Sequence, residues 1–200
     1  MIAKGRSCAQ TLIEDSAEIF NKILLEIPQY WKEMEVSIEK EFRDIAKRES
    51  NGDKEVEIEI YDSQYHGIDE YSDVYSCFYE SLILSIYSFY ERMLKKIIER
   101  NGIKEINGNN NKRKYAMNHI NSIKQYLGKI TFAKDIESKI IDINTTYRTK
   151  RNDIAHEGYE GFHQIDLVFV EELLQKVITV LVDINKLVEA WKNKQTQPKI

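Results

Sequence analysis

The chain has 200 residues, 42% of them hydrophobic, and a formal net charge of −4. This length suits one domain, residues 1–200, with a substantial apolar core. The net negative charge excludes a general, charge-driven nucleic-acid coat, although it allows a local basic site. Only two prolines and eight glycines stand in a sequence rich in Ile, Leu, Lys and Glu, which favours helices. We therefore expect an all-α domain of about five helices.

Targeting signals and paired cysteines are both missing from the sequence. The N-terminus carries no apolar signal core, and no apolar run is long enough to span a membrane. Cys8 and Cys77 are isolated, so they indicate neither a disulfide framework nor a zinc knuckle. We expect a cytoplasmic protein with no membrane partner.

The first long helix is predicted by apolar residues at steps of three and four. Pro28 interrupts this stripe and should kink the helix or split it in two. The turn signal Ser50-Asn51-Gly52 predicts its end. The stripe comprises Ile13, Ala17, Phe20, Leu24, Ile27, Trp31, Met34, Ile38, Phe42 and Ile45.

Residues 51–67 are predicted to form an insertion with a small β element near 54–66. Val56, Ile58 and Ile60 alternate with glutamates, and this period of two is typical of a half-exposed strand. A single strand needs a partner, which the following Tyr61–His66 stretch or another subunit would supply.

Four further helices follow. Apolar stripes predict helices near residues 74–100, 115–127, 132–156 and 164–192. Asn101-Gly102 is a stop signal after the first of them, and the polar segment 107–114 should be a mobile loop. The last helix is apolar on more than one side, so it should be central in the bundle or shared between subunits. Residues 193–200 are expected to form a tail.

A polar row lies beside the apolar stripe of the predicted helix 132–156. Asn144, Arg148, Asn152 and His156 recur every four residues, with Arg151 at the border between row and stripe. Histidine exchanges protons near neutral pH, and arginine stabilises a crowded phosphate. The sequence therefore places groups for phosphodiester chemistry near one helix end.

Arg151, Asn152 and His156 resemble the motif of the HEPN superfamily. In that motif four to six residues separate an arginine from a histidine, and the residue directly after the arginine is usually polar. The segment from Tyr87 to Leu94 is similar to an earlier core helix of that family, in which Glu91 would be the acidic residue near the site. The resemblance covers roughly residues 70–192, and the order of elements is closest to the MAE-type HEPN-like nucleases.

The resemblance implies a HEPN-like helical bundle and a homodimeric, metal-independent endoribonuclease that acts as a toxin or antiphage effector without a cofactor. Arg151, His156 and Asn152 would be catalytic, Glu91 and Asp153 would support them, and RNA would be the substrate. An antitoxin or sensor protein would be a further partner. Family toxins paired with a nucleotidyltransferase usually carry tyrosine two residues after the histidine. Gly158 stands there instead, so we do not expect regulation by nucleotidylation.

Simpler interpretations remain open for the same residues. His156 is also suited to cap a helix C-terminus, and Arg151 to bridge Glu91 or Asp153. Arg148 and Lys150 would bind the RNA backbone or form a solvated face. If these residues are not catalytic, the chain would be a HEPN module that binds RNA, nucleotide or protein. A structural dimer, whose polar row is an interface network, is a further alternative. His119 is expected at the surface or at an interface. His163 with His156 and Glu157 lacks a third firm ligand, so no metal ion is expected.

Overall fold

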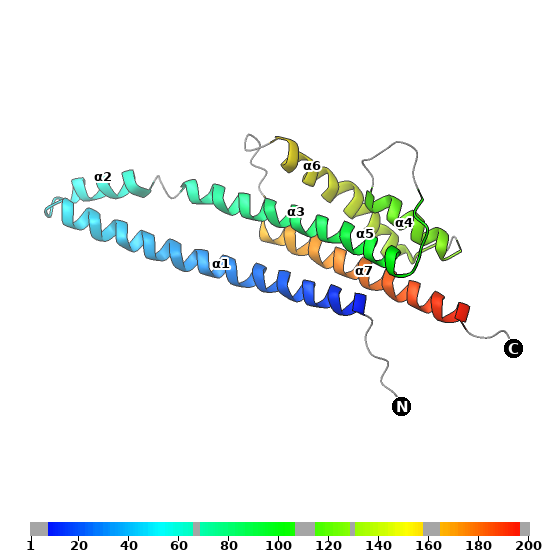
Figure 1. Ribbon diagram of the computed structural model, residues 1–200. Helices are drawn as coiled ribbons and strands as arrows, with labels where there is room; N and C mark the ends of the chain where they lie inside the picture. The colour runs from blue at the N-terminus through cyan, green and yellow to red at the C-terminus, as the bar shows by residue number, and fades with distance from the viewer. Residues whose placement is uncertain (1–7, 66–68, 107–114, 129–130, 158–164, 197–200) are drawn as a thin grey trace, which may run out of the picture.

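The computed structural model describes an all-α helical bundle (Figure 1). It describes residues 8–65, 69–106, 115–128, 131–157 and 165–196, and only the backbone at 8–9, 64–65, 69–76, 115, 156–157 and 196. The loop predicted at 107–114 lies outside these ranges. The all-α prediction is confirmed, because every regular element in the described ranges is a helix.

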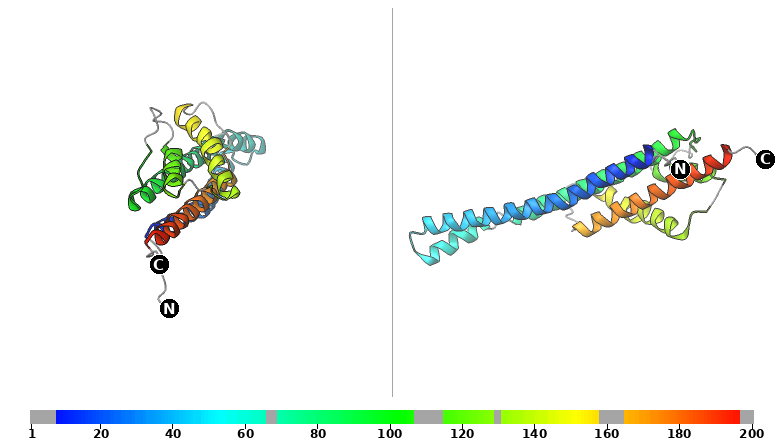
Figure 2. Two further views of the ribbon diagram at one scale, coloured as in Figure 1. Left: turned by 90° about the vertical axis from the view of Figure 1, so that its right-hand side faces the viewer. Right: turned by 90° about the horizontal axis from the view of Figure 1, so that it is seen from below.

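Helix α1 (Cys8–Glu49) runs without interruption through Pro28, so the predicted split does not occur. A proline removes one backbone hydrogen bond, yet α1 continues past it to Glu49, and buried residues, Leu24 and Ala46, stand before and after it. Asn51 and Gly52 then turn the chain with φ of 50° and 91°, as the turn signal predicts. The far half of α1 extends away from the bundle together with α2 (Figures 1 and 2).

The β element predicted near 54–66 is wrong, because helix α2 (Lys54–Tyr65) occupies this segment. The Asp53 carboxylate caps the helix by accepting hydrogen bonds from the backbone N–H groups of Glu55 and Val56, at 3.0 and 3.4 Å. Acidic residues in the first turn suit the positive end of the helix dipole. Capping and the packing of α2 along α1 therefore outweigh the alternating pattern of Val56, Ile58 and Ile60.

Helix α3 (Asp69–Arg100) is buried on two sides. One buried row contains Leu82, Ile86, Met93 and Ile97, and a second contains Ile83, Tyr87, Tyr90 and Leu94. Gly102 adopts a φ of 59°, and the Ile103 N–H donates to the Ile98 carbonyl at 3.0 Å, which closes the helix. The predicted stop at Asn101-Gly102 is confirmed. With both sides covered, α3 separates α1 and α7 from α4 and α6.

The predicted helix 132–156 is three consecutive segments. They are α5 (Lys134–Asp142), a π-helical turn η2 (Ile143–Tyr147) and α6 (Arg148–Glu157). Helix α4 (Tyr115–Tyr126) precedes them and packs on α3. His119 in α4 is 7% exposed, so its predicted surface position is wrong.

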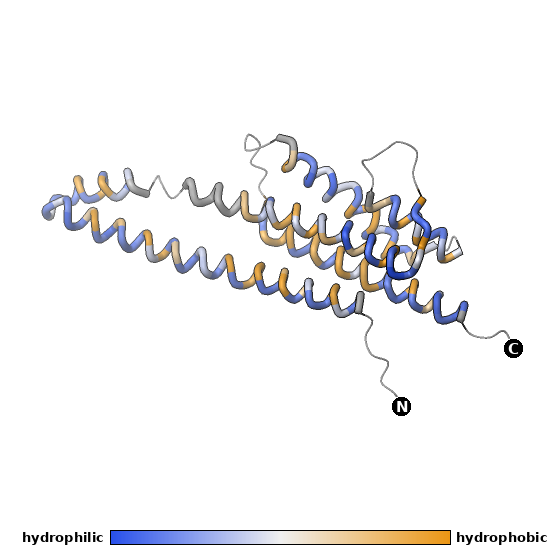
Figure 3. Tube along the Cα trace, viewed as in Figure 1, coloured by the Kyte–Doolittle hydropathy of each residue, from blue (hydrophilic) through white to orange (hydrophobic). Residues whose placement is uncertain are grey.

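Helix α7 (Leu167–Thr196) lies at the centre of the bundle, as its two apolar rows predict. It packs against α1, α3, α5 and η2, and it continues to Thr196, into the predicted tail. Figure 3 shows apolar residues along α7 and α3 and a mostly hydrophilic α6. Despite the apolar character of α7, none of the helices in the described ranges is both long and apolar enough to cross a bilayer. The buried residues of α7 are Val170, Leu173, Leu174, Val177, Val180, Leu181, Ile184, Asn185 and Val188.

Candidate functional site

The π turn η2 separates α5 from the helix that carries the motif. The Arg148 N–H donates to the Ile143 carbonyl five residues earlier, which is the π pattern. Asn144 Nδ2 donates to the Ile140 carbonyl, and Thr145 Oγ1 to the Ile141 carbonyl, both at 2.8 Å. Such side chains compete with backbone bonding, so residues 144–146 help to open the widened turn.

The widened turn changes which residues share a face. It contains about one more residue than an α turn, so it turns α6 back by about 100° relative to an uninterrupted helix. The regular row predicted from Asn144 to His156 therefore does not continue straight across the junction. Asn144, Arg148 and Arg151 nevertheless all reach the same stretch of α3: Asn144 is bonded to Tyr90, and the charges of both arginines act on Tyr87 and Glu91.

Arg151 is half-buried on α6 against α3. Its guanidinium carbon lies 5.8 Å from the centre of the Tyr87 ring, within cation–π range. Its NH1 donates to Asn152 Oδ1 at 3.1 Å, while its buried Nε has no hydrogen-bond partner among the described residues. Among the described side chains, Arg151 is therefore held by the Tyr87 ring and by one hydrogen bond to a neighbouring residue.

Two tyrosines of α3 face the segment formed by η2 and α6. Tyr87 and Tyr90 are 3% and 0% exposed, and their rings meet edge to face at 6.1 Å. Asn144 Nδ2 lies 3.3 Å from Tyr90 Oη. Burial, together with the charge of Glu91, raises the pKa of Tyr87 to about 12, so this hydroxyl remains protonated at neutral pH. From the sequence, both tyrosines were expected only as part of a core helix.

Glu91 lies within range of the charges of Arg151 and Arg148. Burial raises the pKa of its carboxyl, although the charges of Arg151 and Arg148 and a hydrogen bond from the Ala116 backbone N–H oppose that effect. Ala116 lies in the first turn of α4, so Glu91 also neutralises a helix N-terminus. A structural role in holding α4 is therefore combined with its place beside the arginines.

The remaining predicted residues are only partly described. Asp153 and Lys150 are half-buried on α6, and among described side chains Arg151 donates to Asn152 rather than to Glu91 or Asp153. His156 lies in the last turn of α6, but its side chain is outside the described set, as are those of Glu157 and His163. Within the described ranges, no group of three His, Cys, Asp or Glu side chains is arranged to hold a metal ion.

We expect Glu91→Gln to stabilise the protein at pH 7. The raised pKa means that folding disfavours the ionised carboxyl, and glutamine can still accept the Ala116 hydrogen bond. This advantage should shrink as the pH falls through the folded-state pKa towards the ordinary value of about 4.3, because wild-type Glu91 then becomes neutral. Urea unfolding midpoints at pH 7, 5.5 and 4 measure this difference.

Glu99→Gln is the control for that series, because Glu99 is an exposed residue of the same helix. Its surface pair with Lys95 should contribute about 0–1 kcal/mol. A Glu91→Gln variant that is less stable than wild type at pH 7 would show that attraction to the arginines outweighs burial.

Comparison with family models, curated proteins and solved structures gives no significant match for this chain.

Proposed function

We propose that the protein is a metal-independent endoribonuclease of the HEPN type, with a site formed around Arg151 and His156. The observation that carries this proposal is the position of Arg151 on α6, half-buried against Tyr87, with a buried Nε that meets no partner among the described residues. Helix α6 continues unbroken to Glu157 and therefore includes His156. A half-buried arginine that holds its charge against an aromatic ring, on the helix that also carries His156, favours a functional role over a purely structural one.

The proposed reaction is transesterification within RNA. His156 takes the proton of a 2′-hydroxyl, whose oxygen bonds to the adjacent phosphorus. Arg151 stabilises the negative charge that develops on the phosphorane, and Asn152 orients the phosphate or the histidine. The bond from phosphorus to the 5′-oxygen then breaks, and that oxygen receives a proton. The products are a 2′,3′-cyclic phosphate and a 5′-hydroxyl, so DNA would not be cleaved.

Two copies of the chain would complete the site. Arg151 and His156 are five residues apart, which is about 140° around an α-helix and about 7.5 Å along it. One straight helix therefore does not direct both at one phosphate. A two-fold axis would bring two α6 helices together and supply one histidine as base and another as acid. Arg148 and Lys150, on the same helix, would bind neighbouring phosphates, and the cell would restrain the enzyme through an antitoxin or sensor.

The alternative function is a non-catalytic module that binds RNA, nucleotide or a protein. It is favoured by the hydrogen bond between Arg151 and Asn152 and by the bond from Ala116 to Glu91, since both are contacts of a structural network. In that case His156 would only cap the end of α6, where a cation is favourable.

The proposal predicts that His156→Ala lowers RNA cleavage by about 100-fold or more. Purified wild-type and variant proteins are incubated with total cellular RNA in EDTA, and cleavage rates are compared at equal dimer concentration. Circular dichroism and size-exclusion chromatography establish that both are folded and equally associated.

The matched control is His119→Ala, which removes a buried histidine of α4 outside the motif. This substitution should lower the free energy of unfolding but leave the cleavage rate of the folded protein close to that of wild type. If folded wild-type dimer leaves RNA intact, the binding module becomes the better account. If His156→Ala instead dissociates the dimer, the histidine belongs to an interface network.

A further inference from the structure

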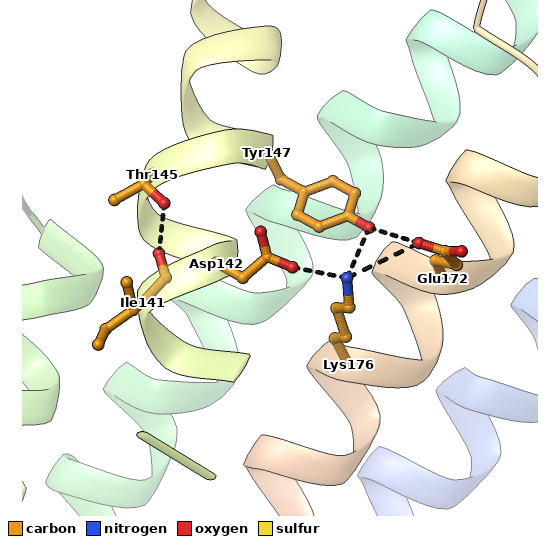
Figure 4. A network of polar contacts seen from close by, with 6 residues as sticks. All are labelled: Ile141, Asp142, Thr145, Tyr147, Glu172 and Lys176. Carbon is orange, nitrogen blue, oxygen red and sulfur yellow. Dashed lines mark hydrogen bonds and ion pairs between the residues drawn. The ribbon is translucent and has the colours of Figure 1, made fainter. Parts of the chain in front are cut away.

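A lysine of the central helix connects both ends of the π turn (Figure 4). Lys176 Nζ lies 2.6 Å from Asp142 Oδ2, the last residue of α5, and donates to Tyr147 Oη, the last residue of η2, at 3.1 Å. Glu172, one turn earlier on α7, lies 3.7 Å from the same ammonium and 3.4 Å from Tyr147 Oη. We call Lys176, Asp142, Tyr147 and Glu172 the π-turn clamp.

The clamp is well packed. The Lys176 ammonium also lies 4.9 Å from the centre of the Tyr147 ring. That ring packs on the ring of Phe169, with 4.7 Å between the two ring centres. The side chains of Lys176 and Asp142 are 28% and 32% exposed, so their ion pair is shielded more than a surface pair. Burial opposes ionisation of Asp142, but hydrogen bonds from Lys176 and Thr146 outweigh it and lower its pKa.

We propose that Lys176 is a positioning residue that fixes the register of the π turn. It thereby orients Arg151 of α6 towards the position of the RNA phosphate in the proposed site. A π turn contains a locally unfavourable extra residue. If its two ends were released, the segment would relax towards regular α-helix, and α6 would rotate by up to about 100°. Arg151 would then lose its contact with the Tyr87 ring. This inference rests on the proposed function, because it assigns Lys176 to the same site.

The chain offers a closely matched control on α4. Lys124 Nζ lies 2.6 Å from Glu137 Oε1 and 5.1 Å from the Phe132 ring centre, and its side chain is 28% exposed. This pair also joins two helices and adds a cation–π contact. However, Glu137 lies in the first turn of α5, before the π turn. Lys124→Met therefore removes an equivalent bridge without releasing η2.

The test compares Lys176→Met with Lys124→Met by two measurements on the full chain. Hydrogen exchange of the amides of residues 148–155 reports the order of α6 independently of any activity. RNA cleavage gives kcat and KM. We expect at least tenfold faster exchange in Lys176→Met alone, and a kcat lower by about 10- to 100-fold with a KM within about threefold of wild type. Lys176→Arg, which keeps the charge, should retain most of the protection from exchange and most of kcat.

The outcomes separate the two proposals. Unchanged α6 exchange in Lys176→Met overturns the clamp, whatever the cleavage assay gives. Faster exchange with undiminished cleavage overturns the positioning role. If α6 loosens but wild type itself cleaves no RNA, the clamp stands and the nuclease proposal fails. Should Lys176→Met not fold, Asp142→Asn replaces it, because the amide keeps the size of the side chain while the ion pair is lost.

Discussion

Replacing Arg151 by lysine should lower kcat for RNA cleavage by about 100-fold or more and leave the fold intact. Lysine keeps the positive charge but loses the planar set of donors with which arginine holds a phosphate. It also keeps a cation beside the Tyr87 ring, so we expect an unfolding midpoint close to that of wild type. Single-turnover cleavage and urea unfolding measure the two effects separately.

Arg92→Lys is the matched control for this substitution. Arg92 is exposed on α3, next in sequence to Glu91, and it should tolerate lysine with little change in rate. Full activity of Arg151→Lys would mean that only charge is needed at this position. A large loss of stability would mean that Arg151 serves mainly to hold α6 on α3.

Leu181→Ala should destabilise the protein by about 2–5 kcal/mol. Leu181 is 0% exposed on α7, which packs against α1, α3, α5 and η2. The substitution removes buried apolar contacts and leaves a cavity in the core. Domains of this size are stable by only about 5–15 kcal/mol, so this loss is large. Chemical denaturation at constant protein concentration gives the value.

Leu187→Ala makes the same chemical change on the same helix at a half-buried position. Its cost should be clearly smaller, because the site is partly open and solvent can enter. Equal losses at the two positions would contradict the central place of α7 and would indicate that residues near 187 are covered by a second copy of the chain.

Helices with strong apolar periodicity were predictable from the sequence. The steps of three and four predicted α7 and allowed its central position, although the helix runs about four residues further than expected, to Thr196. Asn101-Gly102 marked the end of α3. Helix α2 was not predictable in this way, because Val56, Ile58 and Ile60 alternate with glutamates as strand residues do. Its decisive signal was local: Asp53 as an N-terminal cap followed by acidic residues in the first turn.

The candidate site was predictable only as a set of residues on one helix. Its neighbours Tyr87, Tyr90 and Ala116 come from distant parts of the chain, and no spacing rule brings them to Arg151. The π turn was also missed, because a hydrophobic stripe with α-helical spacing passes through it. The Asn144-Thr145-Thr146 run, whose side chains bond to the backbone or to Asp142, was the available signal.

The chemical nature of the cleaved ends tests the central claim most directly. A short RNA of defined sequence that contains a cleavage site is treated with wild-type protein in EDTA, and the fragments are weighed by mass spectrometry. Transesterification by Arg151 and His156 predicts a 2′,3′-cyclic phosphate and a 5′-hydroxyl, with no cleavage when the attacking ribose is 2′-O-methylated. Fragments that carry 5′-phosphate and 3′-hydroxyl ends would contradict it.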